Sequence, residues 1–189
     1  YAKVYGEGKN SSIVRQTTAT VGFAFADSLQ QIGANIGTGG ATIPSFIEVN
    51  DISFEHTDTG NILNIASSQN CIVRRVAFKG PQSSAPDTVG PSCVELSSTA
   101  INQTKNLVFE QCDFTNNNFG IVADDDMQGI LFNGCSFNTL YEGAKLGESV
   151  TGTGSSVDGP KALRITNGYF DNIYDTGIHV YTIGGIVSA

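Results

Sequence analysis

Apolar and polar residues repeat in one pattern along the chain, and each copy ends in a phenylalanine. The residues seven and five positions before the phenylalanine are apolar or cysteine, the spacing of a strand that buries one face. A gap of three positions then precedes the next inward position, which predicts a bend between two short strands. The phenylalanines that end the copies are Phe54, Phe78, Phe114, Phe137 and Phe170.

The bend and the core follow from this alignment. Asn and Gly recur at or beside the bend, where they tolerate left-handed backbone. We expect the phenylalanine rings to form one interior stack with each ring nearly fully buried. Cys112 and Cys135 hold the same position in neighbouring copies, so we expect them to face inward as free thiols. The residues expected at or next to the bend are Asp51, Arg75, Gln111, Gly134 and Asn167.

The spacing of the copies predicts the fold. Intervals of 24, 36, 23 and 33 residues separate the phenylalanines. Such short strands bury a core only by stacking on their neighbours. We therefore predict an all-β chain, a right-handed single-stranded parallel β-helix (a solenoid) of about six to seven coils. Residues 1–189 would form a single domain, with insertion loops at about residues 80–92 and 147–160, where the composition is that of loops. Strand patterns reach both ends, so we expect a fragment of a longer chain.

The segment at residues 4–14 (VYGEGKNSSIV) carries a family resemblance. An apolar pair, Gly-x-Gly, a polar run and two further apolar residues resemble the start of the β-helix in the pectate-lyase-like superfamily, and most of all its phage tailspike and tail-fibre branch. The later copies resemble the superfamily's repeats, so the likeness covers nearly the whole chain. Members include polysaccharide lyases, endoglycosidases, epimerases, acetyl esterases and non-catalytic spikes, so the fold alone does not fix the function.

For a viral spike, the resemblance implies a homotrimer. One outward column fits a covered face because apolar residues stack between charged ones. This face could be covered equally well by a neighbouring subunit or by an insertion loop of the same chain. The column, six positions before each phenylalanine, contains Glu48, Ile72, Val108, Leu131 and Arg164.

Charge and composition exclude several partners. The net charge of −8 argues against nucleic acid, because phosphate backbones are bound by clustered Lys and Arg. No apolar run reaches the roughly 18 residues that membrane insertion needs. The four cysteines lack metal-ligand spacing, and Asp124, Asp125 and Asp126 suit a solvated turn better than a Ca²⁺ site. We expect neither a metal nor a cofactor.

Candidate chemistry appears where two copies align aromatic residues and acids. Tyr141 and Glu142 align with Tyr174 and Asp175 in the next copy. Adjacent strands lie ~4.8 Å apart, so Glu142 and Asp175 could approach the roughly 5–5.5 Å of a retaining glycosidase. Close like charges would raise one carboxyl pKa, as a general acid requires. The plainer alternative is a surface tyrosine ladder beside two solvated acids.

Two further residues complete this predicted edge. Phe119 would extend the aromatic platform into the preceding copy, and His179 should point outward as a substrate-binding residue or general base. We therefore expect catalysis, if any, at Glu142 and Asp175, and saccharide contacts at Phe119, Tyr141, Tyr174 and His179. Elsewhere, Arg74 and Glu110 fall in one column and should pair.

Three functions remain open. The first hypothesis is a bacteriophage tail spike or tail fibre in the virion, which binds a cell-surface polysaccharide and assembles with other virion tail proteins. The second is a polysaccharide-degrading enzyme, a hydrolase or a lyase. The third is a bacterial surface adhesin, secreted or held at the cell surface. The resemblance and the unpaired cysteines, which suit assembly in a cytoplasm, favour the first.

Overall fold

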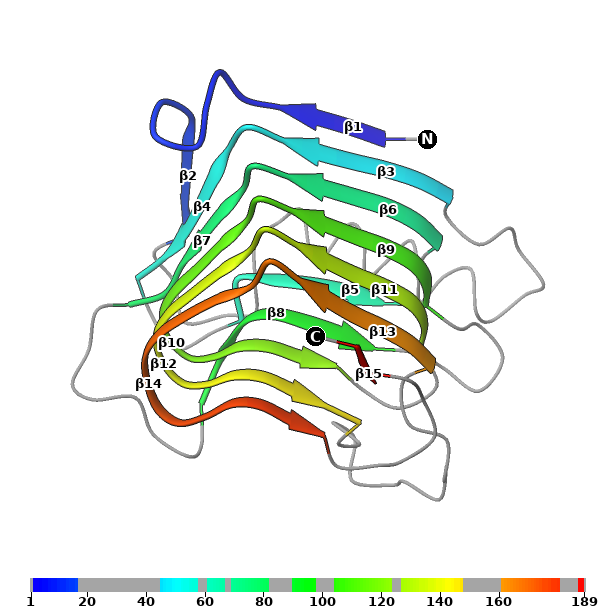
Figure 1. The fold of residues 1–189 in the computed structure, drawn as a ribbon. Coiled ribbons are helices and arrows are strands. Elements are labelled where there is room, and N and C mark those ends of the chain that lie inside the picture. The colour runs from blue at the N-terminus through cyan, green and yellow to red at the C-terminus, as the bar shows by residue number, and fades with distance from the viewer. Residues whose placement is uncertain are drawn as a thin grey trace.

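The computed structural model (Figure 1) is all-β in the part of the chain that it describes. It describes residues 2–16, 45–57, 61–66, 69–81, 90–97, 104–123, 127–147, 161–180 and 187–188. Within these ranges no helix is long and apolar enough to cross a membrane. Most of the two expected insertion loops, residues 82–89 and 148–160, lies outside the described residues.

One sheet has seven strands among the described residues, and every pairing within it is parallel. Along this sheet the paired residues form one column: Ile47, Cys71, Leu107, Ile130 and Leu163, each in register with the next. This is the first apolar column of the repeat, so the predicted alignment is confirmed. The strands, in their order in the sheet, are β1 (Ala2–Tyr5), β3 (Ser45–Asn50), β6 (Gln69–Arg74), β9 (Lys105–Glu110), β11 (Gln128–Asn133), β13 (Lys161–Thr166) and β15 (Val187–Ser188).

The second sheet is also parallel, and its strands alternate in sequence with those of the first. Its main path runs through β2 (Ile13–Gln16), β4 (Ser53–His56), β7 (Ala77–Lys79), β10 (Asp113–Ala123), β12 (Ser136–Leu146) and β14 (Tyr169–Val180). A branch adds β5 (Leu63–Ala66) and β8 (Ser92–Ser97). The first part of β10 pairs with β7 and its last part with β8. A long strand in this half of the chain therefore replaces two short ones, and the arrangement is compatible with a parallel β-helix.

Left-handed residues mark the bends between strands. At the predicted bend, Asp51, Arg75, Gln111, Gly134 and Asn167 all have φ between 51° and 63°, as expected. The ladder of backbone hydrogen bonds continues through this bend, for example from Arg75 N to Glu110 O at 2.8 Å. The bend therefore leaves these backbone groups paired. A second set of left-handed residues bends the long strands of the second sheet: Asn116, Thr139 and Asn172.

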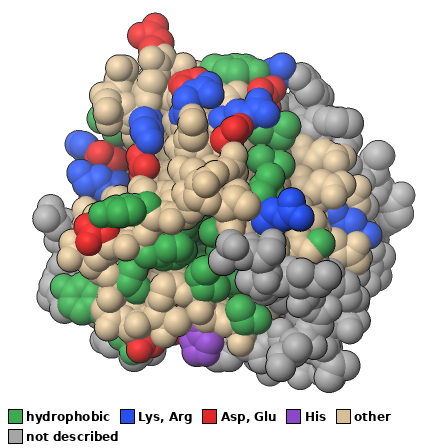
Figure 2. Space-filling model, viewed as in Figure 1, with side chains coloured by type: hydrophobic (Ala, Val, Ile, Leu, Met, Phe, Trp, Pro, Cys, Tyr) green, Lys and Arg blue, Asp and Glu red, His purple; other side chains and the backbone are tan. Residues whose placement is uncertain are grey.

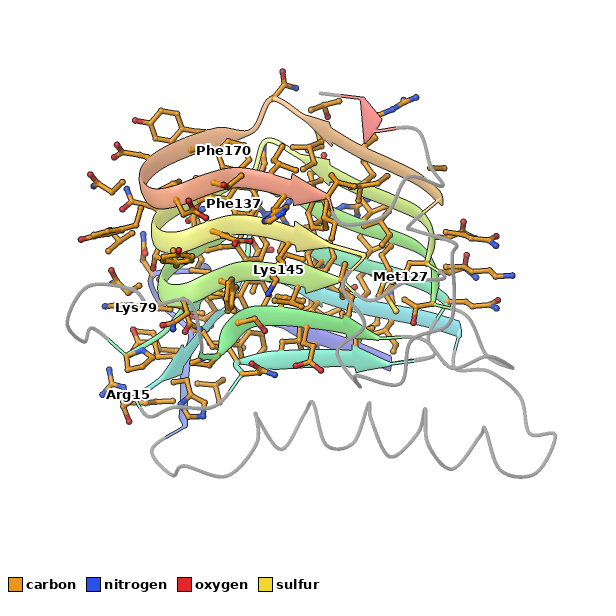
Figure 3. The ribbon with its side chains drawn as sticks, turned by 90° about the horizontal axis from the view of Figure 1, so that it is seen from below. Arg15, Lys79, Met127, Phe137, Lys145 and Phe170 are labelled. Carbon is orange, nitrogen blue, oxygen red and sulfur yellow. The ribbon has the colours of Figure 1, made fainter. Side chains whose placement is uncertain are left out.

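The phenylalanine stack forms the centre of the core, as predicted. Consecutive ring centroids lie 5.9, 5.3, 4.9 and 4.7 Å apart from Phe54 to Phe170. Four of the rings are at most 2% exposed, but Phe170 is only partly buried, which corrects the expectation of full burial. The reason is its place on β14, the last strand on the main path of the second sheet, where no described strand covers its outer side. Figure 3 labels Phe137 and Phe170 on neighbouring strands.

The four cysteines are free and buried, as the alignment predicted for Cys112 and Cys135. These two precede Asp113 and Ser136, which are paired across β10 and β12. Burial raises the pKa of Cys71 and Cys93 to about 12 each. The Cys71 and Cys93 thiols therefore act as small apolar core groups.

The raised thiol pKa values predict a loss of stability in alkali. In the unfolded chain Cys71 and Cys93 ionise near pH 9.0, whereas in the folded protein they keep their protons up to about pH 12. Between these values the unfolded state binds fewer protons, so the free energy of unfolding must fall as pH rises. Urea unfolding measured across this range should show a steeper fall for the native chain than for a Cys71→Ala, Cys93→Ala double variant. Equal slopes would contradict the assignment.

The outer face of the first sheet carries opposite charges in alternation. Arg74 Nε lies 2.8 Å from Glu110 Oε2, which confirms the predicted pair, and Lys3 Nζ lies 3.2 Å from Glu48 Oε2. Figure 2 shows blue and red side chains intermixed over the upper strands of this sheet. Such exposed pairs contribute only ~0–1 kcal/mol each. The outward column of Ile72, Val108 and Leu131 is in register and partly exposed.

Candidate functional site

The outward face of the second sheet brings together most of the predicted site. Figure 3 views this face, where β5, β8, β10, β12 and β14 lie side by side and Lys145 is labelled. In one column Phe119 pairs with Glu142, and Glu142 with Thr176. In the next column Lys145 pairs with His179. We call the group formed by Phe119, Tyr141, Glu142, Lys145 and His179 the outward strip.

Close packing of the strands explains why the strip starts where it does. A β-carbon on Gly120 would lie 2.4 Å from the Gly143 carbonyl oxygen, so neighbouring strands meet without side chains at this point. Beyond the glycines, Ile121 and Ala144 turn into the core. Phe119, just before Gly120, is 5% exposed but stands apart from the core cluster.

Glu142 has the most unusual surroundings in the strip. It is only 5% exposed, although sequence reasoning placed it at a solvated edge. Its Oε1 lies 3.4 Å from His179 Nδ1. Its Oε2 is buried and has no hydrogen-bond partner among the described residues. Burial of a polar atom without a partner costs free energy, so a donor that reached this oxygen would stabilise it, but contact with a ligand first requires a side-chain movement that exposes it.

An aromatic and a cationic group lie against Phe119, the register partner of Glu142. The Phe119 and Tyr141 rings meet edge to face, with centroids 6.4 Å apart and planes at 83°. Lys145 Nζ lies 5.0 Å from the Phe119 centroid, within cation–π range. Phe119 therefore lies beneath Tyr141 and Lys145. Tyr141, in contrast to Phe119, is partly exposed and offers ring surface to a ligand.

The expected pairing of the two acids is wrong. Leu140 pairs with Ile173 but Glu142 pairs with Thr176, so β14 holds one more residue than β12 at this point. At this β-bulge, two residues of β14, Tyr174 and Asp175, lie opposite the single residue Tyr141 of β12. Asp175 is therefore not the register partner of Glu142 but immediately precedes that partner, Thr176.

The remaining predicted residues divide between the strip and the solvent. Tyr174 is 57% exposed and Asp175 is exposed, both on the bulge. His179 points outward as predicted, and its Nδ1 lies 3.4 Å from Glu142 Oε1. Phe119 lies in the column of Glu142, not in the predicted column of Tyr141, and its burial prevents it from serving as an open platform.

Sequence reasoning missed Lys145, although a signal was present. Lys145 and His179 each stand two residues after an aligned glycine, Gly143 and Gly177, which gives them the same outward position. Asp124, Asp125 and Asp126 lie outside the described residues. Among the residues that are described, no group of three or more His, Cys, Asp or Glu could hold a metal ion.

Comparison with known proteins gives no match: no family model fits the chain, and no curated protein and no solved structure shows significant similarity to it.

Proposed function

We propose that the chain forms a right-handed single-stranded parallel β-helix that binds a cell-surface polysaccharide through the outward strip. The parallel sheets, the in-register columns and the left-handed bends support this fold. The resemblance of residues 4–14 to phage tailspikes and tail fibres supports a role in a bacteriophage tail appendage. A bacterial surface adhesin of the same fold would use the strip in the same way.

The observation that carries the binding proposal is the buried Glu142 carboxylate, with one oxygen on His179 and the other without a partner among the described residues. Sugars supply hydroxyl groups, and one of these would donate a hydrogen bond to this oxygen once a side-chain movement of Glu142 exposes it. The apolar C–H faces of sugars pack on aromatic rings, and Tyr141 lies beside this carboxylate in sequence and is partly exposed. A saccharide therefore matches both the polar and the aromatic parts of the strip.

The proposed assembly is a homotrimer held to other virion tail proteins. The stacked Ile72, Val108 and Leu131 give the outer face of the first sheet an apolar stripe of the kind that interfaces cover. This stripe lies on the other sheet from the outward strip, so assembly and saccharide binding would not compete.

Binding should depend on Tyr141 and Glu142. The test is retention of the protein on immobilised dextran, xylan, polygalacturonate, hyaluronan, bacterial lipopolysaccharide and capsular polysaccharide. We expect Tyr141→Ala and Glu142→Gln each to weaken retention at least about tenfold, or ~1.4 kcal/mol. Tyr5→Ala, which removes a tyrosine 54% exposed on β1, is the control and should bind like the native chain. If no polysaccharide is retained, or if both strip variants bind normally, the proposal fails.

Cleavage of the bound polysaccharide is the second candidate function. The observation in its favour is the contact between Glu142 Oε1 and His179 Nδ1, since a carboxylate on one ring nitrogen orients an imidazole for proton transfer at the other. An enzyme would shorten the polysaccharide, and His179→Asn would stop the shortening. Size-exclusion chromatography of the incubated polysaccharide distinguishes the two functions.

A further inference from the structure

A second polar group lies on the same face as the outward strip, on β8. Glu95 pairs with Val122, Val122 with Lys145, and Lys145 with His179, so these residues form one continuous outward column. Three steps of ~4.8 Å place Glu95 about 14 Å from His179 along the stack of strands. The column therefore links Glu95 to the strip without a break in register.

Glu95 is held in a defined position by its neighbours. Asn61 Nδ2 donates a hydrogen bond to Glu95 Oε2, and Asn61 Oδ1 accepts hydrogen bonds from Ser92 N at 2.8 Å and Ser92 Oγ at 3.1 Å. Ser92 is 2% exposed, so its contacts fix the Asn61 amide from below. Glu95 and Asn61 are both only partly buried, which leaves them within reach of a ligand.

The carboxyl group of Glu95 suits a hydrogen-bonding partner. Burial raises the pKa of Glu95. Carboxyl oxygens accept the hydrogen bonds that sugar hydroxyls donate. Between Glu95 and Lys145 lies only the small, partly exposed Val122, which would let a chain pass over the face.

We propose that Glu95 and Asn61, positioned by Ser92, form a second saccharide subsite, and that the ligand is an internal stretch of a polysaccharide that spans β8 to β14. A terminal sugar alone would reach the Glu142 end of this face and leave Glu95 without a contact. The inference rests on the proposed function, because it assigns the length and direction of the ligand at the same site.

The test uses whichever polysaccharide of the panel above the native chain retains. Short and long fragments of it are prepared by partial hydrolysis, and calorimetry measures the affinity of the protein for each. We expect the hexasaccharide to bind at least about tenfold more tightly than the disaccharide. Glu95→Ala should lose about tenfold for the hexasaccharide and nothing for the disaccharide, and Glu95→Gln, which keeps hydrogen bonding, should recover most of the loss. Glu7→Ala, in the exposed loop after β1, is the matched control.

The outcomes separate this inference from the proposed function. Unfolding curves of each variant establish that Glu95→Ala is folded, and a variant that fails to fold is replaced by Asn61→Ala in the same comparison. If folded Glu95→Ala binds the hexasaccharide as tightly as the native chain does, the second subsite is wrong. The same conclusion follows if Glu95→Ala loses equal affinity for the hexasaccharide and the disaccharide. In both cases the proposed polysaccharide binding stands. If the native chain binds no fragment and no polysaccharide, the proposed function itself fails, and the subsite with it.

Discussion

Replacement of Phe114 by alanine is expected to lower the free energy of unfolding by about 3–5 kcal/mol. The Phe114 ring is fully buried and lies between Phe78, 5.3 Å away at an interplanar angle of 9°, and Phe137, 4.9 Å away at 13°. Its removal leaves a cavity that the flanking rings cannot fill, because each is held by its own strand. Urea unfolding followed by circular dichroism gives the change.

Phe170→Ala is the matched control for this prediction. Phe170 is only partly buried and stacks on one described ring, Phe137, at 4.7 Å. Its loss should therefore cost less than the loss of Phe114. If both substitutions lower the free energy of unfolding equally, or if Phe114→Ala lowers it by less than about 1 kcal/mol, the phenylalanine stack does not stabilise the core as its geometry indicates.

Replacement of Glu142 by methionine should raise the stability of the protein and abolish the polysaccharide binding that we propose. The native side chain buries a carboxylate with one oxygen lacking a partner among the described residues, which is unfavourable by about 1–3 kcal/mol. Methionine has a similar length, is apolar and adapts to the ring of Phe119, which pairs with this position. We expect an increase in unfolding free energy of that order, together with loss of retention on the polysaccharide that the native chain binds.

Glu110→Met provides the comparison, because Glu110 is a partly exposed glutamate paired with Arg74 on the other sheet. Its replacement should lower stability by ~0–1 kcal/mol and leave binding intact. A stability gain confined to position 142 would identify a residue kept for function at the expense of stability. A large loss of stability in Glu142→Met would instead make Glu142 a structural residue and remove the main support for the binding site.

The inward columns show how much of the fold was readable from the sequence. Apolar residues two positions apart and a break of three positions predicted the paired columns, the bend and the phenylalanine stack, and the structure confirms them. These features follow from local periodicity, because burial on one face imposes alternation along each strand. Only the end of the stack differed, since the burial of Phe170 depends on what lies beyond β14.

The candidate site was predicted only in part because it depends on register between strands. Sequence alignment without a gap set Glu142 against Asp175, but one extra residue in β14 pairs Glu142 with Thr176 and brings His179 to its carboxylate. A bulge moves every later side chain relative to the neighbouring strand.

The sequence by itself therefore determined which residues face the core, since buried apolar residues alternate with outward ones along each strand. The tertiary structure decided which outward residues meet, how deeply Glu142 is buried, and that Lys145 and Glu95 share its face. Outward side chains are free of the alternation that core packing imposes. Their contacts depend instead on the pairing of strands far apart in the chain, which only the assembled sheets fix.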